Sequence, residues 1–424
     1  MVESIDLSDG QTFRHGFPHE FFRWLRDEKP LYWHPPTSVT PDGEGFWVLS
    51  RHQDIATTIR DHQGFSSARG GTREHGGTAI KDERSAGDML NQSDNPHHRR
   101  LRELVQKGFT TRAIAKLEDE LRNRTRRLLD DIAEQDAFDC VRELARELPL
   151  QAICIILGVP QSDRTELARL VDAGIENNTG DVIGHDMLRA LGRYAETLIE
   201  EKRQRPTDDI LSTIVHAEIQ GYDEPKLSNR ELRLFFNLLF PAGAETTRSA
   251  IAGGVKAFMD FPDQLARLRA DPSLVSTAVE EIVRWTTPSI YKRRTATADV
   301  VIHDQLIRAG DKVTYWEMSA NRDEREFCEP FRFDISRSPN RHLGFGAGIH
   351  FCLGSQLARL EIRVVLDELY RRYENFELAG EPLWMPSNRL LGLKQLDLRG
   401  KRLGESAQRK LAIPGLTSTD SVCE

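Results

Sequence analysis

The feature that most constrains this chain is a glycine-rich loop with a single cysteine near the carboxyl end, Phe345-Gly346-Ala347-Gly348-Ile349-His350-Phe351-Cys352-Leu353-Gly354. Glycine carries no side chain and tolerates positive φ, so the backbone of this loop can approach a large flat partner closely. The loop runs directly into a helical pattern, and amides at a helix amino terminus stabilise a thiolate. The loop therefore predicts that Cys352 is a ligand or a reactive group.

Two other interpretations explain this loop less well. The spacing of Gly346 and Gly348 is similar to part of a dinucleotide-binding fingerprint, but the third glycine is misplaced and no strand-helix-strand unit surrounds it. A structural zinc site through His350 and Cys352 would require two more ligands, which usually come in paired spacing, and the sequence has no such pair.

The pattern Phe-Gly-x-Gly-x-His-x-Cys-x-Gly resembles the haem-binding loop of the cytochrome P450 family, and every motif position matches. The resemblance implies that Cys352 is the axial thiolate ligand of the iron of haem b. It also implies that four neighbours in the loop contact the cofactor, namely Phe345, Gly346, His350 and Gly354.

A second motif, Ala242-Gly243-Ala244-Glu245-Thr246-Thr247, lies inside an apolar stretch of helical periodicity at about 229–261. Threonine and glycine are poor residues for a helix interior, so these residues alone would fit a helix kink beside a solvated glutamate. They resemble the acid and alcohol pair of the family's long distal helix, which implies that Glu245 and Thr246 relay protons to dioxygen. Pro241 removes one backbone hydrogen bond and predicts a kink just before the motif.

A third motif places Glu281 three residues before Arg284, on one face of a helix. Such a pair is usually a surface ion pair of small effect on stability. Here it resembles the family's Glu-x-x-Arg signature, which implies that the pair binds a later arginine and has a structural role.

A fourth segment, Asp94-Asn95-Pro96-His97-His98-Arg99-Arg100-Leu101-Arg102, resembles the family's helix that meets the haem propionates. Two carboxylates in a partly buried pocket require cationic or hydrogen-bonding partners. The resemblance assigns this role to His98 and Arg102, together with Arg294 and His350. His97 competes with His98, and the four-residue spacing from His98 to Arg102 favours His98.

The length of 424 residues would allow two or three domains, but the motifs extend from Asp94 to Gly354, so we expect one domain over 1–424 with a weakly ordered tail at about 404–424. We expect a mainly α fold with a small β lobe, and haem between the long kinked distal helix and the helix after the cysteine loop. Helices are predicted at 99–135, 228–261, 273–286 and 355–373, strands at 46–50, 300–302 and 312–316, and mobile loops at 66–91 and 173–185.

The amino terminus shows no signal pattern and the chain has no run of about eighteen apolar residues, so we expect a cytoplasmic monomer without a membrane anchor. Five cysteines without disulfide-like spacing fit a reducing compartment. A net charge of −8 argues against a nucleic-acid-binding protein. The sequence has no flavin or nicotinamide fingerprint, so a ferredoxin and a ferredoxin reductase are expected to supply electrons, with docking at Arg100 and Arg359 near Cys352.

The resemblance implies a haem-thiolate monooxygenase that inserts one oxygen atom of dioxygen into a C–H bond or alkene of a hydrophobic small molecule, such as a sterol or terpenoid. Tailoring of a polyketide or peptide natural product is an alternative, followed by a peroxide-driven haem-thiolate enzyme or a haem sensor. By resemblance, the substrate pocket is lined by Leu239, Ala242, Ser289, Ile290, Tyr291 and Leu391.

Overall fold

Fourteen α-helices and twelve strands are seen in the computed structural model, which describes residues 5–71, 73–176 and 185–404. The helices are α1 His19–Glu28, α2 His52–Arg60, α3 His97–Val105, α4 Thr111–Ala115, α5 Glu118–Ala133, α6 Glu147–Leu157, α7 Arg164–Glu176, α8 His185–Gln204, α9 Ile210–His216, α10 Asn229–Asp260, α11 Pro262–Ala270, α12 Val275–Thr286, α13 Glu317–Ala320 and α14 Ser355–Arg372. The strands are β1 Leu31–His34, β2 Phe46–Leu49, β3 Phe65–Ser66, β4 Phe138–Asp139, β5 Tyr291–Ala296, β6 Val300–Ile302, β7 Gln305–Ile307, β8 Lys312–Trp316, β9 Tyr373–Leu378, β10 Leu383–Trp384, β11 Leu393–Gln395 and β12 Asp397–Arg402.

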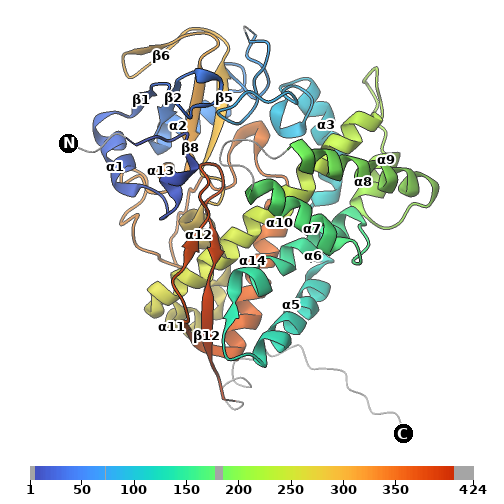
Figure 1. Ribbon diagram of the computed structural model, residues 1–424, viewed down its shortest axis with the longest axis vertical. Helices are drawn as coiled ribbons and strands as arrows, with labels where there is room; N and C mark the ends of the chain where they lie inside the picture. The colour runs from blue at the N-terminus through green and yellow to red at the C-terminus, as the bar shows by residue number, and fades with distance from the viewer. Residues whose placement is uncertain (1–4, 72, 177–184, 405–424) are drawn as a thin grey trace.

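Helix α10 crosses the middle of the molecule, and the other long helices surround it (Figure 1). Its amino terminus is fixed by a capping box, in which Ser228 and Glu231 each bind the other's backbone amide. Apolar side chains on several faces of α10 pack against α6, α8, α12 and α14 in the main hydrophobic core. The helix continues through Pro241, whose ring nitrogen has no hydrogen to donate to the carbonyl of Asn237.

A smaller lobe contains a five-stranded sheet of order β1-β2-β8-β5-β3, seen at the upper left of Figure 1. Strand β5 pairs antiparallel with β8, so that Arg294 lies opposite Val313. Strand β2 pairs parallel with β8. This sheet places β5 between the lobe and the helical body, and β5 carries one of the predicted cofactor contacts.

Most of the predicted elements are present, with boundaries shifted by a few residues. The helices at 228–261 and 355–373 correspond to α10 and α14, and the three predicted strands correspond to β2, β6 and β8. The predicted helix at 99–135 is wrong in its continuity, because the chain there forms α3, a 3-10 turn at Gln106–Phe109, α4 and α5.

The predicted loops and tail are described only in part. Residues 66–91 contain the end of β3 and the start of a short 3-10 turn at Leu90–Gln92. Most of the predicted loop at 173–185 and nearly all of the predicted tail lie outside the described residues. In the stretches of chain that the structure describes, no helix has the length and apolar character needed to cross a bilayer.

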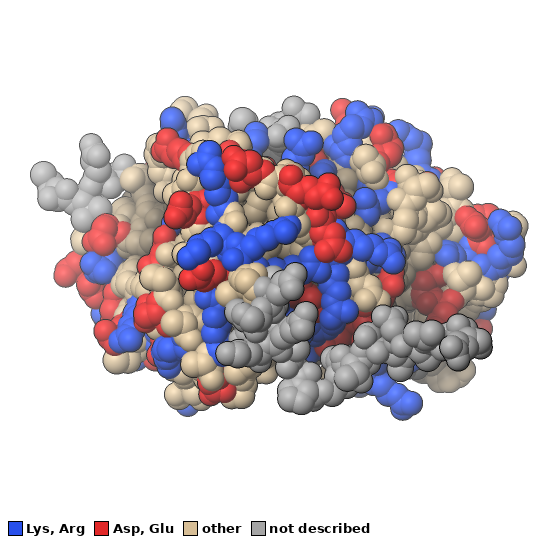
Figure 2. All heavy atoms as spheres, turned by 90° about the horizontal axis from the view of Figure 1, so that it is seen from below, with Lys and Arg blue, Asp and Glu red and all other residues tan. Residues whose placement is uncertain are grey.

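Acidic and basic side chains lie next to one another on the face at the lower end of Figure 1, which Figure 2 shows. Ion pairs of this kind join neighbouring elements of the helical body and of the β9–β12 sheet, such as Arg372 with Asp130 at 2.6 Å and Lys401 with Glu374 at 2.7 Å. This interleaving is typical of a solvated surface and not of a nucleic-acid interface, which requires an extended basic area.

Candidate functional site

The cysteine loop adopts the backbone conformations that its glycines predict. Gly346 and Gly348 have φ of 68° and 67°, in the left-handed region that favours glycine. The amide of Cys352 donates to the carbonyl of Phe345 at 2.9 Å, which closes the loop directly before α14. Partial burial raises the pKa of the Cys352 thiol, while the backbone N–H of Gly354 and the cations Lys292 and Arg102 oppose that rise.

Three of the four predicted propionate contacts, His98, Arg102 and His350, form one cluster beside this loop. The fourth, Arg294, acts on the cluster through its positive charge. The imidazole rings of His98 and His350 have centroids 4.3 Å apart, and Ser67 Oγ lies 2.9 Å from His350 Nε2. Burial lowers the pKa of His98 to about 4, with further lowering from Arg102 and Arg294. His98 is therefore neutral at pH 7.

His98 and His97 differ in their surroundings. His98 is buried, whereas the side chain of His97 is 38% exposed and lies 4.0 Å from Glu231 on another side of α3. Nε2 of His98 is buried without a hydrogen-bond partner within the described part of the chain. A neutral imidazole with an unused nitrogen can bind a further polar group.

The cationic charge of this cluster is only partly compensated. The side chain of Arg102 makes no ion pair or hydrogen bond among the described residues, and Arg294 donates only to the carbonyl of Arg293 and stacks on Tyr315 at 5.3 Å. Asp94, the acid that acts on His98, already accepts hydrogen bonds from Ser66 Oγ and the Ser67 amide. This arrangement fits an anionic group placed between α3, β5 and the cysteine loop.

Sequence reasoning missed Lys292, which lies two residues before Arg294 on β5. Because side chains alternate along a strand, these two cations share a face, and the field of Lys292 reaches Cys352. Its ammonium pairs with Glu317, a fully buried carboxylate. The sequence analysis predicted no strand at β5, so the alternation that links Lys292 with Arg294 was not used.

The two residues of the predicted proton relay are adjacent in α10 but do not face the same surroundings. Thr246 is half-buried, and its hydroxyl donates to the carbonyl of Ala242 at 2.9 Å. Ala242 is exposed and Leu238 is half-buried, so positions 238, 242 and 246 form an accessible stripe at helical spacing. Glu245, in contrast, is buried with an ion pair to Arg248 at 2.6 Å.

A neighbouring side of α10 is packed. A Cβ on Gly243 would lie 2.9 Å from Ile153 Cδ1 of α6, so the glycine permits the two helices to approach closely. The accessible stripe is therefore the side of α10 that can face a ligand, and it includes Leu238, which the sequence interpretation did not select.

The predicted substrate residues fall into two groups. Ser289, Ile290 and Leu391 are held together by backbone hydrogen bonds, from Leu391 to Pro288 at 2.8 Å and from Ile290 to Arg389 at 3.2 Å. Leu239 and Ala242 lie on α10.

Tyr291 was assigned to the pocket, and the structure does not support that role. Its ring is fully buried at 4.9 Å from the Trp316 ring, and its hydroxyl accepts a hydrogen bond from the Ile80 amide. The alternation along β5 turns position 291 to the side opposite Lys292 and Arg294, into the core of the small lobe.

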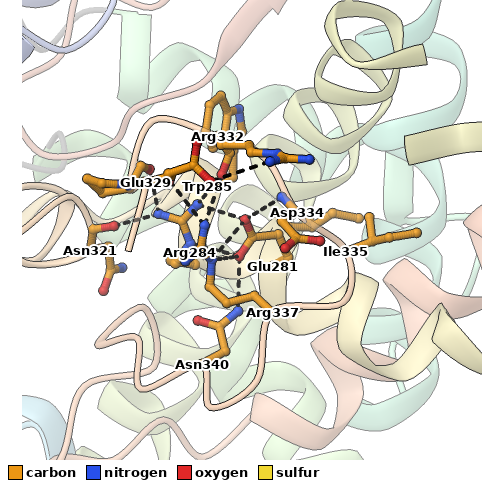
Figure 3. Close-up of polar contacts among 12 residues, drawn as sticks. Glu281, Arg284, Trp285, Asn321, Glu329, Arg332, Asp334, Ile335, Arg337 and Asn340 are labelled. Atoms are coloured by element: carbon orange, nitrogen blue, oxygen red, sulfur yellow. Dashed lines mark hydrogen bonds and ion pairs between the residues drawn. The ribbon is translucent and has the colours of Figure 1, made fainter. Parts of the chain in front are cut away.

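Glu281 and Arg284 form the centre of a buried polar network (Figure 3). Two parallel hydrogen bonds of 2.7 Å join them, and both side chains are fully buried. Arg337 is the later arginine, with Nε 3.2 Å from Glu281 Oε2. Arg284 also donates to the carbonyls of Asn321, Pro330 and Arg332, which ties the segment before the cysteine loop to α12.

The predicted electron-donor docking residues differ in placement. Arg359 stacks on Phe345 at 4.5 Å and binds Glu280 with both ends of its guanidinium, at 2.6 and 2.9 Å. Arg100 is buried and donates to Glu231 and to the carbonyls of Glu224 and Lys226. The assignment of Arg100 to a docking surface is therefore wrong, because its charge is used inside the fold to anchor the start of α10.

The residues of this site fit a haem. A thiolate-ligated haem requires a cysteine, partners for its two propionates and room along the helix that follows the cysteine. The cysteine is Cys352, and the undercompensated cations are the propionate partners. Gly354 leaves the room, because a Cβ there would meet no atom within 4 Å. In the described ranges, no three His, Cys, Asp or Glu side chains gather as a metal site, so a lone cysteine fits a metal that arrives within a cofactor.

Comparisons with known proteins agree with this geometry. A family model described as Cytochrome P450 matches residues 182–398. Cytochrome P450 126 of Mycobacterium tuberculosis is 48% identical over 407 residues, covering 94% of this chain and 98% of that protein. The methyl-branched lipid omega-hydroxylase of Mycobacterium bovis is 39% identical, with 88% and 89% covered. The steroid C26-monooxygenase of Rhodococcus jostii is 36% identical, with 94% and 85% covered.

Among solved structures, a Mycobacterium marinum cytochrome P450 in complex with pseudoionone superposes with a TM-score of 0.84 at 35% identity. The superposition covers 94% of this chain and 99% of the other.

Proposed function

This chain belongs to the cytochrome P450 family of monooxygenases, and on that premise we propose that it oxidises a hydrophobic small molecule of the sterol or terpenoid class, with electrons from a ferredoxin. Two observations carry the proposal: the apolar, accessible stripe of α10 and the half-buried thiol of Cys352 in its glycine-rich loop before α14. The proposed reaction inserts one oxygen atom of dioxygen into a C–H bond or alkene and reduces the other to water.

We propose that haem is held by Cys352 through its sulfur and by His98, Arg102, Arg294 and His350 through its propionates. When bound through a thiolate, haem supplies dioxygen activation, because the thiolate donates electron density that favours O–O cleavage. The chain's own contribution is to keep the sulfur deprotonated. The Gly354 amide and the nearby cations stabilise the thiolate, and coordination to the metal removes the remaining cost of ionisation.

Proton delivery is assigned to Glu245 and Thr246. Thr246 presents a hydroxyl on the accessible stripe, where it can donate a hydrogen bond to a reacting group. The same oxygen can accept a proton in return. In this structure the hydroxyl proton of Thr246 is donated to the Ala242 carbonyl, and it can turn to a better acceptor when one is bound. Glu245 is the nearest acid on the same helix, and it is buried.

Two kinds of observation support the substrate class. Apart from Thr246, the accessible side chains of the stripe are the apolar ones of Leu238 and Ala242, and an apolar lining selects an apolar ligand. The predicted neighbours Leu239, Ile290 and Leu391 are also apolar, and they are buried. Two relatives that span most of this chain are named for oxidation of a methyl-branched lipid and of a steroid.

A substrate titration tests the proposal. Sterols, terpenoids, fatty acids and polyketide fragments are added in turn to the purified ferric protein, and the haem absorption band is followed. A blue shift with a sterol or terpenoid, followed by NADH-dependent product with ferredoxin and its reductase, is the expected result. Ala242→Phe should abolish the shift by filling the stripe, whereas Ala115→Phe, at an exposed alanine of α4, should not. A shift only with a polyketide or peptide fragment would contradict the proposed class.

Thr246→Ala should divert electrons from product to peroxide. General acid-base groups contribute at least about a hundredfold to proton-transfer steps, so we expect the product formed per NADH to fall about tenfold or more while substrate binding stays unchanged. The measurement is product and hydrogen peroxide per NADH consumed. Thr197→Ala removes an exposed hydroxyl from α8 and serves as the control. An unchanged product yield in the Thr246 variant would exclude the relay role.

A further inference from the structure

Arg248 is a buried cation of α10 that none of the predicted roles uses. One terminal nitrogen lies 2.6 Å from Glu245 Oε2, and the same nitrogen lies 3.0 Å from the sulfur of Met385. Both Arg248 and Glu245 are less than one-tenth exposed. A charged pair at this depth is retained only when each partner satisfies the other, because an isolated buried charge is costly.

Helix geometry shows which way this pair turns the carboxylate. Successive residues of an α-helix are about 100° apart around its axis, so Arg248 lies about 200° from Thr246. Glu245 lies between them, and its ion pair with the residue three positions later draws the carboxylate toward the packed side of α10. The acid and the alcohol of the relay are therefore held apart by Arg248.

The contact with Arg248 leaves the carboxylate incompletely satisfied. The approach of the two groups lacks hydrogen-bond geometry, and Glu245 Oε2 and Arg248 Nε are both buried without a hydrogen-bond partner within the described residues. Breaking this ion pair therefore costs less free energy than breaking the fully hydrogen-bonded pair of Glu281 and Arg284.

Three charged groups from three elements act on Glu245. Arg248 comes from α10 itself, Asp172 from α7, and Arg146 from the junction between the π-helical turn Val141–Ala145 and α6. Arg146 is already paired with Asp172, so these two largely cancel. Burial raises the pKa of Glu245, and Arg248 is the main group that opposes the rise.

We propose that Arg248 is a positioning residue for proton delivery, which holds the Glu245 carboxylate turned away from Thr246 until the pair opens during turnover. The proposal rests on the proposed function. Arg248 also contacts Met385, which lies between β10 and β11 in the segment that carries Leu391. A ligand that displaces this segment would therefore also move the Arg248 guanidinium.

The direct test is the protonation state of Glu245 in Arg248→Met. Without the cation, the main group that opposes the effect of burial is lost and the pKa of Glu245 rises further, so more of the carboxyl is protonated at a given pH. Infrared difference spectra against Glu245→Gln should then show a stronger carbonyl stretch of the protonated acid in Arg248→Met than in the wild type or in Arg248→Lys. This readout requires no turnover.

The pH profile of turnover gives the second readout. The proton-donating form of Glu245 persists to higher pH when its pKa rises, so the alkaline limb of kcat should move up by at least about one pH unit in Arg248→Met. Arg248→Lys should restore the alkaline limb of the wild-type pH profile. Arg233→Met changes another arginine of α10, whose ion pair with Glu196 is exposed, and should leave the alkaline limb at its wild-type pH.

Three outcomes would overturn the proposal. The first is an equal carboxyl band in wild type and Arg248→Met, and the second is a shift of the limb that persists in Glu245→Gln. The third is that Arg248→Met and Arg248→Gln both fail to fold while Arg248→Lys folds, which would make the arginine purely structural. Failure of the proposed function is seen separately, as a wild-type protein without a thiolate-type carbon monoxide spectrum or NADH-dependent product.

Discussion

Replacement of Cys352 by serine is expected to abolish the red-shifted, thiolate-type absorption band of the reduced, carbon-monoxide-bound protein, together with all NADH-dependent product. A serine hydroxyl at this position is not ionised at neutral pH and donates far less electron density than a thiolate, so neither the ligation nor the O–O cleavage that depends on it survives. The loop itself should persist, because its hydrogen bond from residue 352 to Phe345 uses the backbone.

The matched control is Cys328→Ser. Cys328 is an exposed, free cysteine, so its loss changes the thiol content by the same amount without touching the loop. We expect this variant to keep both the spectrum and the activity. A thiolate-type band that survived in Cys352→Ser would refute the assignment of the ligand, whatever the activity.

Glu281→Ala should give the second large effect, a loss of stability with failure to retain haem. The carboxylate binds Arg284 twice, and it also accepts hydrogen bonds from Arg337, Asn340 and the Asp334 amide. Removing one partner from a buried ion pair leaves the other uncompensated, which costs about 3–5 kcal/mol. Because the network holds the segment before the cysteine loop, we expect the haem content to fall with the stability.

Chemical unfolding followed by circular dichroism, with haem content from absorbance, measures both effects. Glu166→Ala is the matched control, since Glu166 pairs with Arg169 at the same three-residue spacing but both side chains are more than half exposed. That variant should unfold at the wild-type denaturant concentration. A Glu281 variant of wild-type stability and haem content would show that the network is dispensable.

Local motifs predicted most of the candidate site without the fold. The cysteine loop requires specific backbone angles, and Gly346 and Gly348 adopt them, because a positive φ is a property of a single residue that the neighbours only need to permit. The choice of His98 over His97 also followed from local geometry, because two residues four apart in a helix share a face.

Predictions that depended on packing between distant segments were less accurate. Arg100 is exposed on a helical wheel only until α10 is placed against it, and Tyr291 is buried by Trp316 and Ile80 from elsewhere in the chain. The predicted helix at 99–135 is interrupted because the chain turns twice there; Gly108 lies in the first turn, and the prediction ran the helix through this poor helix former.

The sequence by itself determined the family, and it predicted the ligand and the acid and alcohol pair, because each depends on residue types at short spacing. Only the tertiary structure decided where the Glu245 carboxylate points, since Arg248, Asp172 and Arg146 act on it from three elements. It likewise decided that Arg284 would be fully buried, with Arg337 completing its network from more than fifty residues away. Charge partners, burial and accessible faces are properties of packing, and packing arises only when the helices meet.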